Sequence, residues 1–89
     1  MTLNIVLLKK KIIYRSCYRG TKEMDKLLGS FTKKYIDELS INDLSDLENL
    51  LNLDDDNIYK FYNGFKTDYK FAENRINLLF KNFVYTDFW

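Results

Sequence analysis

The sequence contains no histidine, no proline and a single cysteine, and only three of its 89 residues are glycine. One cysteine excludes an internal disulfide, and without histidine the metal sites built from cysteine and histidine are absent. The most common general base is missing too, and the sequence shows no glycine-rich phosphate loop and no pairing of a nucleophile with a base. We therefore predict no catalytic residues, no metal site and no enzymatic activity of the chain's own.

Long hydrophobic runs are also lacking. The apolar stretch at residues 3–8 is far shorter than the roughly 20 residues that cross a bilayer. Lysines follow this stretch instead of preceding it, and no small-residue cleavage site comes after it, so it is not a convincing signal peptide. We expect a cytoplasmic protein without membrane insertion.

Apolar residues make up 46% of the sequence and aromatic residues 17%, which is the composition of a globular protein. Five segments carry apolar residues at helical spacing, and no strand-like alternation competes with them. These stripes are Ile5, Leu8, Ile12, Ile13 and Cys17; Met24, Leu27, Leu28, Phe31 and Tyr35; Leu44, Leu47, Leu50 and Leu51; Ile58, Phe61, Tyr62 and Phe65; and Ala72, Ile76, Leu79, Phe80 and Phe83. We predict an all-α fold, a compact five-helix bundle-like single domain over residues 1–89.

Polar residues indicate where several of these helices begin and end. The first helix is expected over about residues 3–18, with Cys17 as a small buried hydrophobe. Ser40 and Asp43 have the spacing of a capping box for the third helix. The acidic run 54–56 lacks the glycine and distant glutamate of a calcium loop and is interpreted as capping the fourth helix.

Two further boundaries and the end of the chain complete the predicted layout. Asn63-Gly64 is expected to end the fourth helix, and Thr67 to cap the fifth. At the C-terminal end, Phe88 and Trp89 are expected to cover the core, with a partner contact as the alternative.

Charge is distributed unevenly along the chain. Residues 1–36 hold nine Lys and Arg against two Asp and Glu, whereas residues 37–63 hold one against eight. A basic first third is compatible with nucleic-acid binding, but no recognisable DNA- or RNA-binding module accompanies it. We expect no nucleic-acid partner and keep a small helical nucleic-acid-binding or antitoxin-like interaction protein as the alternative function.

The stretch from Arg19 to Glu23, with Gly20 at its bend, has two interpretations. In the local one, Gly20 ends the first helix and caps the second, which places Glu23 at the third helical position, and Arg19 suits the negative end of the first helix. In the other, the same residues form a contact surface for a partner. Local structure alone accounts for all three residues.

A resemblance supports the second interpretation. The stretch from Arg19 to Asp25 contains Arg-Gly-x-x-Glu followed by Met-Asp, with Leu27-Leu28-Gly29 and Phe31 after it. It resembles the signature of the FAD assembly (flavinylation) factors of succinate dehydrogenase. The leucine-rich third helix, the acidic run and the aromatic fourth helix resemble the layout of that family, so that the similarity covers about residues 11–83.

This resemblance implies an assembly factor that binds the flavoprotein subunit of succinate dehydrogenase while FAD is attached covalently to it, with the fumarate reductase flavoprotein as a further candidate. It implies that no cofactor is bound stably by the chain, which acts on FAD attachment in its partner, and we expect a monomer when free. The partner-binding residues that it implies are Arg19, Gly20 and Glu23, flanked by Tyr18, Met24 and Asp25.

Overall fold

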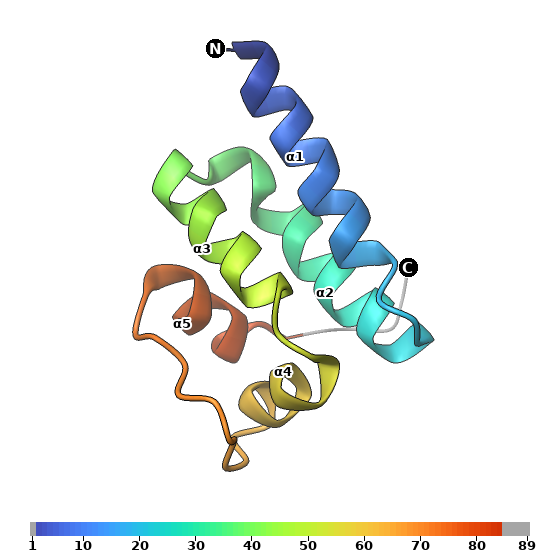
Figure 1. The fold of residues 1–89 in the computed structure, drawn as a ribbon, viewed down its shortest axis with the longest axis vertical. Coiled ribbons are helices and arrows are strands. Elements are labelled where there is room, and N and C mark those ends of the chain that lie inside the picture. The colour runs from blue at the N-terminus through green and yellow to red at the C-terminus, as the bar shows by residue number, and fades with distance from the viewer. Residues whose placement is uncertain (1, 85–89) are drawn as a thin grey trace.

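The computed structural model describes residues 2–84, with side chains from Asn4 onward. Within that range the chain forms five α-helices and one 3₁₀ turn, and no strand, so the predicted all-α, five-helix fold is confirmed (Figure 1). The elements are α1 (Thr2–Cys17), α2 (Lys22–Tyr35), η1 (Ile36–Glu38), α3 (Ile41–Leu51), α4 (Asp55–Tyr62) and α5 (Arg75–Asn82). The prediction for Phe88 and Trp89 lies outside the described residues.

Helices α1 and α2 lie side by side and run in opposite directions (Figure 1). A buried hydrogen bond of 2.7 Å joins the hydroxyls of Ser16 and Thr32 across their interface. One turn further, Gly29 of α2 faces Cys17, where an added Cβ would lie 3.0 Å from the Cys17 sulfur. Close approach of the two backbones therefore needs glycine at position 29. Cys17 is half-buried, so the prediction of a buried thiol is only partly correct.

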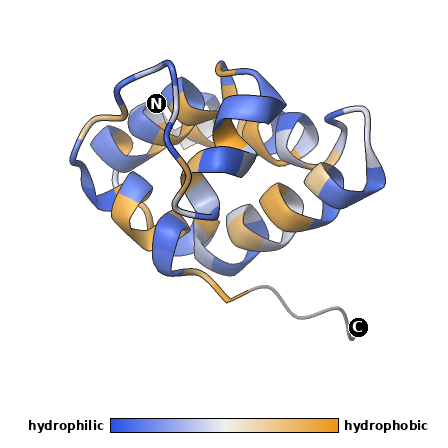
Figure 2. Ribbon diagram, turned by 90° about the horizontal axis from the view of Figure 1, so that it is seen from below, coloured by the Kyte–Doolittle hydropathy of each residue, from blue (hydrophilic) through white to orange (hydrophobic). Residues whose placement is uncertain are grey.

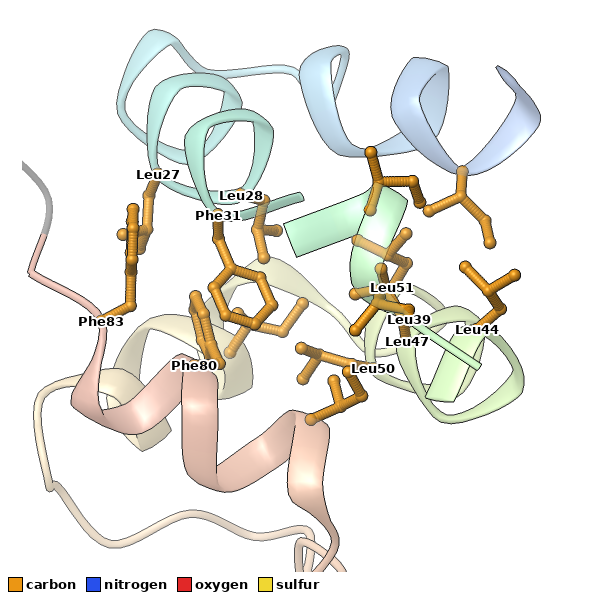
Figure 3. Packing of buried hydrophobic residues seen from close by; sticks show 14 of the residues in the cluster. Leu27, Leu28, Phe31, Leu39, Leu44, Leu47, Leu50, Leu51, Phe80 and Phe83 are labelled. Carbon is orange, nitrogen blue, oxygen red and sulfur yellow. The ribbon is translucent and has the colours of Figure 1, made fainter. Parts of the chain in front are cut away.

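A single hydrophobic cluster draws residues from all five helices. Its centre is formed by rings and leucines, with Phe31 of α2 against Phe80 of α5, their centroids 5.2 Å apart at an interplanar angle of 69° (Figure 3). The cluster comprises Ile12, Met24, Leu27, Leu28, Phe31, Ile36, Leu39, Leu44, Leu47, Leu50, Leu51, Ile58, Ile76, Phe80 and Phe83. Most positions of the predicted stripes of α2 and α3 are among them. In Figure 2, hydrophobic and hydrophilic positions alternate along the helices, as expected when each helix buries one side.

The start of α3 matches its prediction. The Ser40 hydroxyl accepts from the Asp43 amide at 3.2 Å, and the Asp43 carboxylate accepts from the Ser40 amide at 3.2 Å, which completes the capping box. Asp43 also receives a 2.7 Å hydrogen bond from the Arg75 guanidinium, so the same carboxylate ties the start of α3 to the start of α5.

The predicted end of α4 at Asn63-Gly64 is confirmed, whereas the placement of Phe65 in that helix and the predicted start of α5 are wrong. Helix α4 ends at Tyr62, and Gly64 follows with φ of +77°, so that Phe65 lies beyond the helix with 63% of its surface exposed. Helix α5 begins at Arg75, where the Asn74 side chain accepts from the Asn77 amide at 2.8 Å. Thr67 is thus not its cap.

Residues 63–74, which separate these two helices, carry no regular helix. Ala72 lies in this segment, and its carbonyl accepts from the Asn77 side chain at 2.8 Å. Apolar residues thus keep helical spacing through this segment, although its backbone is not helical. No helix in residues 2–84 is both long and apolar enough to span a bilayer.

Candidate partner-binding site between α1 and α2

Residues 18–21, here called the Gly20 turn, connect α1 to α2. Gly20 has φ of +115°, a conformation that side-chain-bearing residues rarely adopt, and a Cβ built on it would meet no atom within 4 Å. Glycine is therefore required here by backbone conformation and not by lack of space. Arg19 lies two residues beyond the end of α1, so its predicted place in the last turn of that helix is wrong.

Thr21, and not Gly20, is the N-cap of α2. Its hydroxyl accepts from the Met24 amide at 3.3 Å. Glu23 is consequently the second helical residue instead of the third, and the predicted cap at Gly20 with Glu23 completing it is wrong. The Glu23 side chain is not needed as a cap, because Thr21 caps the helix without it, but Glu23 still lies in the first turn of α2, where a negative charge favours the helix N-terminus.

The backbone of the Gly20 turn is bound by a side chain of α2. One carboxylate oxygen of Asp25 accepts from the amide of Arg19 and, at 3.2 Å, from the amide of Gly20. Neither amide has a backbone carbonyl as acceptor within residues 2–84, so without Asp25 they would need water or another acceptor. Asp25 therefore fixes the course of the chain through the turn.

The Arg19 side chain leaves the turn and reaches the connection between α3 and α4. Its Nε donates to the Asp55 carboxylate at 2.9 Å, its Nη1 to the Leu51 carbonyl at 2.7 Å and its Nη2 to the Leu53 carbonyl at 2.9 Å. Nη2 also lies 2.9 Å from the same Asp55 oxygen. The planar guanidinium thus satisfies carbonyls left free where α3 ends and pairs with a carboxylate at the start of α4. Arg15, one helical turn earlier, donates to the Asn52 side chain of the same connection.

Burial differs sharply between the two charged ends of the motif. The Arg19 side chain is only 11% exposed, because it lies against the α3–α4 connection. Glu23 is exposed and forms no hydrogen bond or ion pair with any residue of the described range 2–84. The arginine is used inside the chain, whereas the glutamate remains available.

Two tyrosines extend the outward face of the site. Tyr18 is 68% exposed and Tyr14 is 65% exposed, and their rings lie 4.6 Å apart at 34°. Tyr14 was not among the site residues predicted from the sequence. Tyr14 and Tyr18 are four residues apart and therefore lie on the same face of a helix, opposite the buried Ile12 and Ser16. This spacing could have indicated Tyr14 as a neighbour of Tyr18.

The six predicted partner-binding residues thus occupy two kinds of position. Tyr18, Gly20 and Glu23 are exposed, while Met24 is 5% exposed and packs in the core, and Arg19 and Asp25 are bonded within the chain. Their role in partner binding stays a prediction. Among residues 2–84, no group of three or more Cys, Asp or Glu side chains is arranged to hold a metal ion.

Comparison with known families identifies what kind of protein carries this site. Residues 10–84 match the family described as flavinator of succinate dehydrogenase. The chain belongs to this family. The resemblance predicted from the Arg-Gly-x-x-Glu motif is therefore confirmed, and the Gly20 turn, α2 and the acidic start of α4 all fall inside the matched region.

Individual relatives of the flavinator family are similar over about half of the chain. The FAD assembly factor SdhE of Acetobacter pasteurianus is 33% identical over 52 residues, which is 58% of this chain and 48% of the relative. Succinate dehydrogenase assembly factor 2, mitochondrial, of Meyerozyma guilliermondii is 41% identical over 51 residues, 57% of this chain and 38% of the relative. The matched segment spans about half or less of these relatives. No solved structure matches the chain.

Proposed function

We propose that this chain binds the flavoprotein subunit of succinate dehydrogenase and promotes the covalent attachment of FAD to it. Membership of the flavinator family supports the class of function. The observation that carries the site is the contrast between Glu23, exposed and without a bond among the described residues, and the turn beside it, which Asp25 and Arg19 hold. A fixed turn next to an exposed charge suits a surface made for another protein.

An assembly factor can accelerate this attachment by positioning alone. The reaction requires the flavin ring to lie against the acceptor side chain of the flavoprotein, with stabilisation of the negative charge that develops on the ring. Both demands concern how the flavoprotein is folded around its own FAD. The chain, which has no histidine, contributes a binding surface and no catalytic group in this proposal, and it holds no FAD of its own.

Each exposed residue of the site has a role in this proposal. Glu23 accepts hydrogen bonds from donors of the flavoprotein, and such charge-assisted bonds are stronger than neutral ones. Tyr18 supplies an aromatic surface that packs against the partner, as tyrosine commonly does at interfaces. Gly20, with no side chain, allows the partner's backbone to approach the turn closely. Arg19 keeps these groups in place from inside the chain.

A factor that acts during assembly must also leave, so we expect an interface of about 1,600 Å² or less and a transient complex. The fumarate reductase flavoprotein is a second candidate partner on the same reasoning. A monomeric free state, a cytoplasmic location and the lack of a nucleic-acid partner stay predictions.

The test measures covalent flavin fluorescence of the flavoprotein subunit on a denaturing gel, with and without this chain. We expect the chain to raise the fraction of subunit that carries FAD. In the same assay Glu23→Gln should slow attachment and weaken binding about tenfold, because it removes the charge from an interfacial hydrogen bond. Its melting temperature should change little, since the Glu23 side chain caps nothing in α2.

The matched control is Glu38→Gln, which makes the same chemical change at an exposed residue of η1. The 14 residues of α2 separate it from the Gly20 turn, about 20 Å at 1.5 Å per residue. It should attach FAD like the unchanged protein. Equal flavin fluorescence with and without the chain would refute the proposed function, and equal loss in both variants would remove Glu23 from the site.

A further inference from the structure

We propose that Asp55 is a positioning residue for the partner-binding surface and that it acts through Arg19. This inference rests on the proposed function, because it concerns how the surface for the flavoprotein is held. It adds to the site a residue from the other half of the chain, 36 positions from the arginine that it binds.

The geometry shows why Asp55 has this role and its acidic neighbours do not. Asp55 receives both Nε and Nη2 of Arg19, each at 2.9 Å. Asp54 instead accepts from the Asn57 side chain at 2.6 Å, and Asp56 pairs with Lys60 at 3.0 Å on the surface of α4. Three consecutive carboxylates therefore serve three different partners, and only the middle one binds the Gly20 turn.

Asp55 is the first residue of α4, at the end of the helix that lies nearest to Arg19. Its side chain is 29% exposed, against 69% for Asp56, so its charge is partly withdrawn from water beside the guanidinium. The two carbonyls bound by Arg19, those of Leu51 and Leu53, hold Nη1 and Nη2 but carry no net charge. Asp55 is thus the anion that balances Arg19 where the side chain is buried.

The backbone on either side of the Arg19 side chain is the surface proposed to meet the flavoprotein. Tyr18 precedes Arg19 and Gly20 follows it, so the position of the guanidinium constrains both. Asp25 binds the amides of the same turn from the α2 side. The turn is therefore held from two directions, and removal of the Asp55 charge weakens the hold on one of them, where the Leu51 and Leu53 carbonyls remain as acceptors. The backbone can then occupy several positions, and binding must select one.

The experiment measures the affinity of the flavoprotein subunit for four proteins: the unchanged chain, Asp55→Asn, Arg19→Gln and the double variant. Asp55→Asn keeps the size of the side chain and removes its charge. We expect it to bind about fivefold more weakly at a temperature where circular dichroism shows every variant folded. Asp56→Asn is the matched control, one residue away on the exposed side of α4, and should bind like the unchanged chain.

The double variant decides whether Asp55 acts through Arg19. If it does, adding Asp55→Asn to Arg19→Gln should cause little further loss, because the two residues share one interaction. Independent, additive losses would mean that Asp55 contacts the flavoprotein itself and would overturn the inference. Unchanged affinity of Asp55→Asn would overturn it as well.

A second measurement needs no partner and separates this inference from the proposed function. Amide hydrogen exchange at Arg19 and Gly20 should be about fivefold or more faster in Asp55→Asn than in Asp56→Asn, since the turn opens more often. Unchanged exchange would refute the positioning role even if the flavoprotein binds. If the unchanged chain fails to bind the flavoprotein while exchange responds as expected, the proposed function and the partner part of this inference fail, and Asp55 retains only its hold on the turn.

Discussion

Two connections in this molecule bend at a glycine with positive φ, and they are stabilised by different forces. The Gly20 turn is held by charged groups, with Asp25 on its backbone and Asp55 on the Arg19 side chain. The connection after α4, which bends at Gly64, is held by rings. Phe71 lies flat on Phe61 with centroids 4.1 Å apart and an angle of 9°, and Tyr69 meets the edge of Phe71 at 5.2 Å.

The difference bears on the partner-binding role proposed for the Gly20 turn. Stacked rings stabilise a loop mainly by burying apolar area. Charged hydrogen bonds depend on distance and angle, so a turn held by them has one defined geometry. A surface that must fit a partner needs the second kind of support. The predictions below test this contrast, beginning with the largest expected effect.

Arg19→Ala should destabilise the chain by about 2 to 3 kcal/mol, because it leaves the partly buried Asp55 carboxylate and two carbonyls without their donor. The melting temperature should fall by roughly 10 °C or more for a chain of this size. Differential scanning calorimetry measures both quantities. A variant as stable as the unchanged protein would show that the guanidinium does not hold the α3–α4 connection.

Alanine at the two positive-φ glycines compares the connections directly. Gly20→Ala and Gly64→Ala should each cost about 1 to 2 kcal/mol in chemical denaturation, because the backbone conformation is strained and no space is lacking at either position. Only Gly20→Ala should also reduce flavoprotein binding beyond the effect of unfolding. Equal loss of binding in both variants would show that the Gly20 turn is no more specific than its counterpart.

Phe71→Leu should weaken the ring-held connection by about 1 kcal/mol, the usual contribution of an aromatic pair. Flavoprotein binding should be unchanged, since Phe71 lies in the segment before α5 and not at the Gly20 turn. Urea unfolding and the flavin fluorescence assay test the two statements. A binding defect without unfolding would extend the partner surface to this side of the molecule.

The surface pair of Asp56 and Lys60 gives the smallest expected effect. The hydrogen bond that Lys60 donates to Asp56 and the charge of that carboxylate raise the pKa of Lys60 above its ordinary value of 10.5. A raised lysine pKa adds stability below pH 10.5 that is lost as the pH rises through the folded-state pKa. Because the group is exposed, Lys60→Met should leave the melting temperature at pH 7 unchanged within error. A clear loss would give this exposed pair a weight comparable to that of Arg19 and Asp55.

The sequence was sufficient for the features that depend on neighbours within one helical turn. The stripe of α2 and the capping box of Ser40 and Asp43 were predicted because both are set by spacings of three and four residues. The start of α5 was not, because apolar residues at helical spacing continue from Ala72 into the helix while Asn74 provides the actual cap. Local pattern does not show where helical hydrogen bonding begins.

The contacts within the candidate site were not predictable from local sequence pattern either, because they join residues far apart in the chain. The motif was recognised, and Gly20 was correctly placed at the bend between two helices. The partners of Arg19, however, are 32 to 36 residues away, and no local pattern couples them to the motif. Nothing in the spacing of Arg19 and Glu23 indicates that one charge is bound inside and the other faces outward.

The long separation between Arg19 and its acceptors also bears on how the chain folds. Helices α1 and α2 are neighbours in sequence and can pair early, because closing a short connection costs little entropy. The Arg19 contacts can form only after the ends of α3 and α4 have reached the turn. A chain that has folded only its first two helices therefore contains the whole Arg-Gly-x-x-Glu motif without its finished geometry, which also requires the ends of α3 and α4.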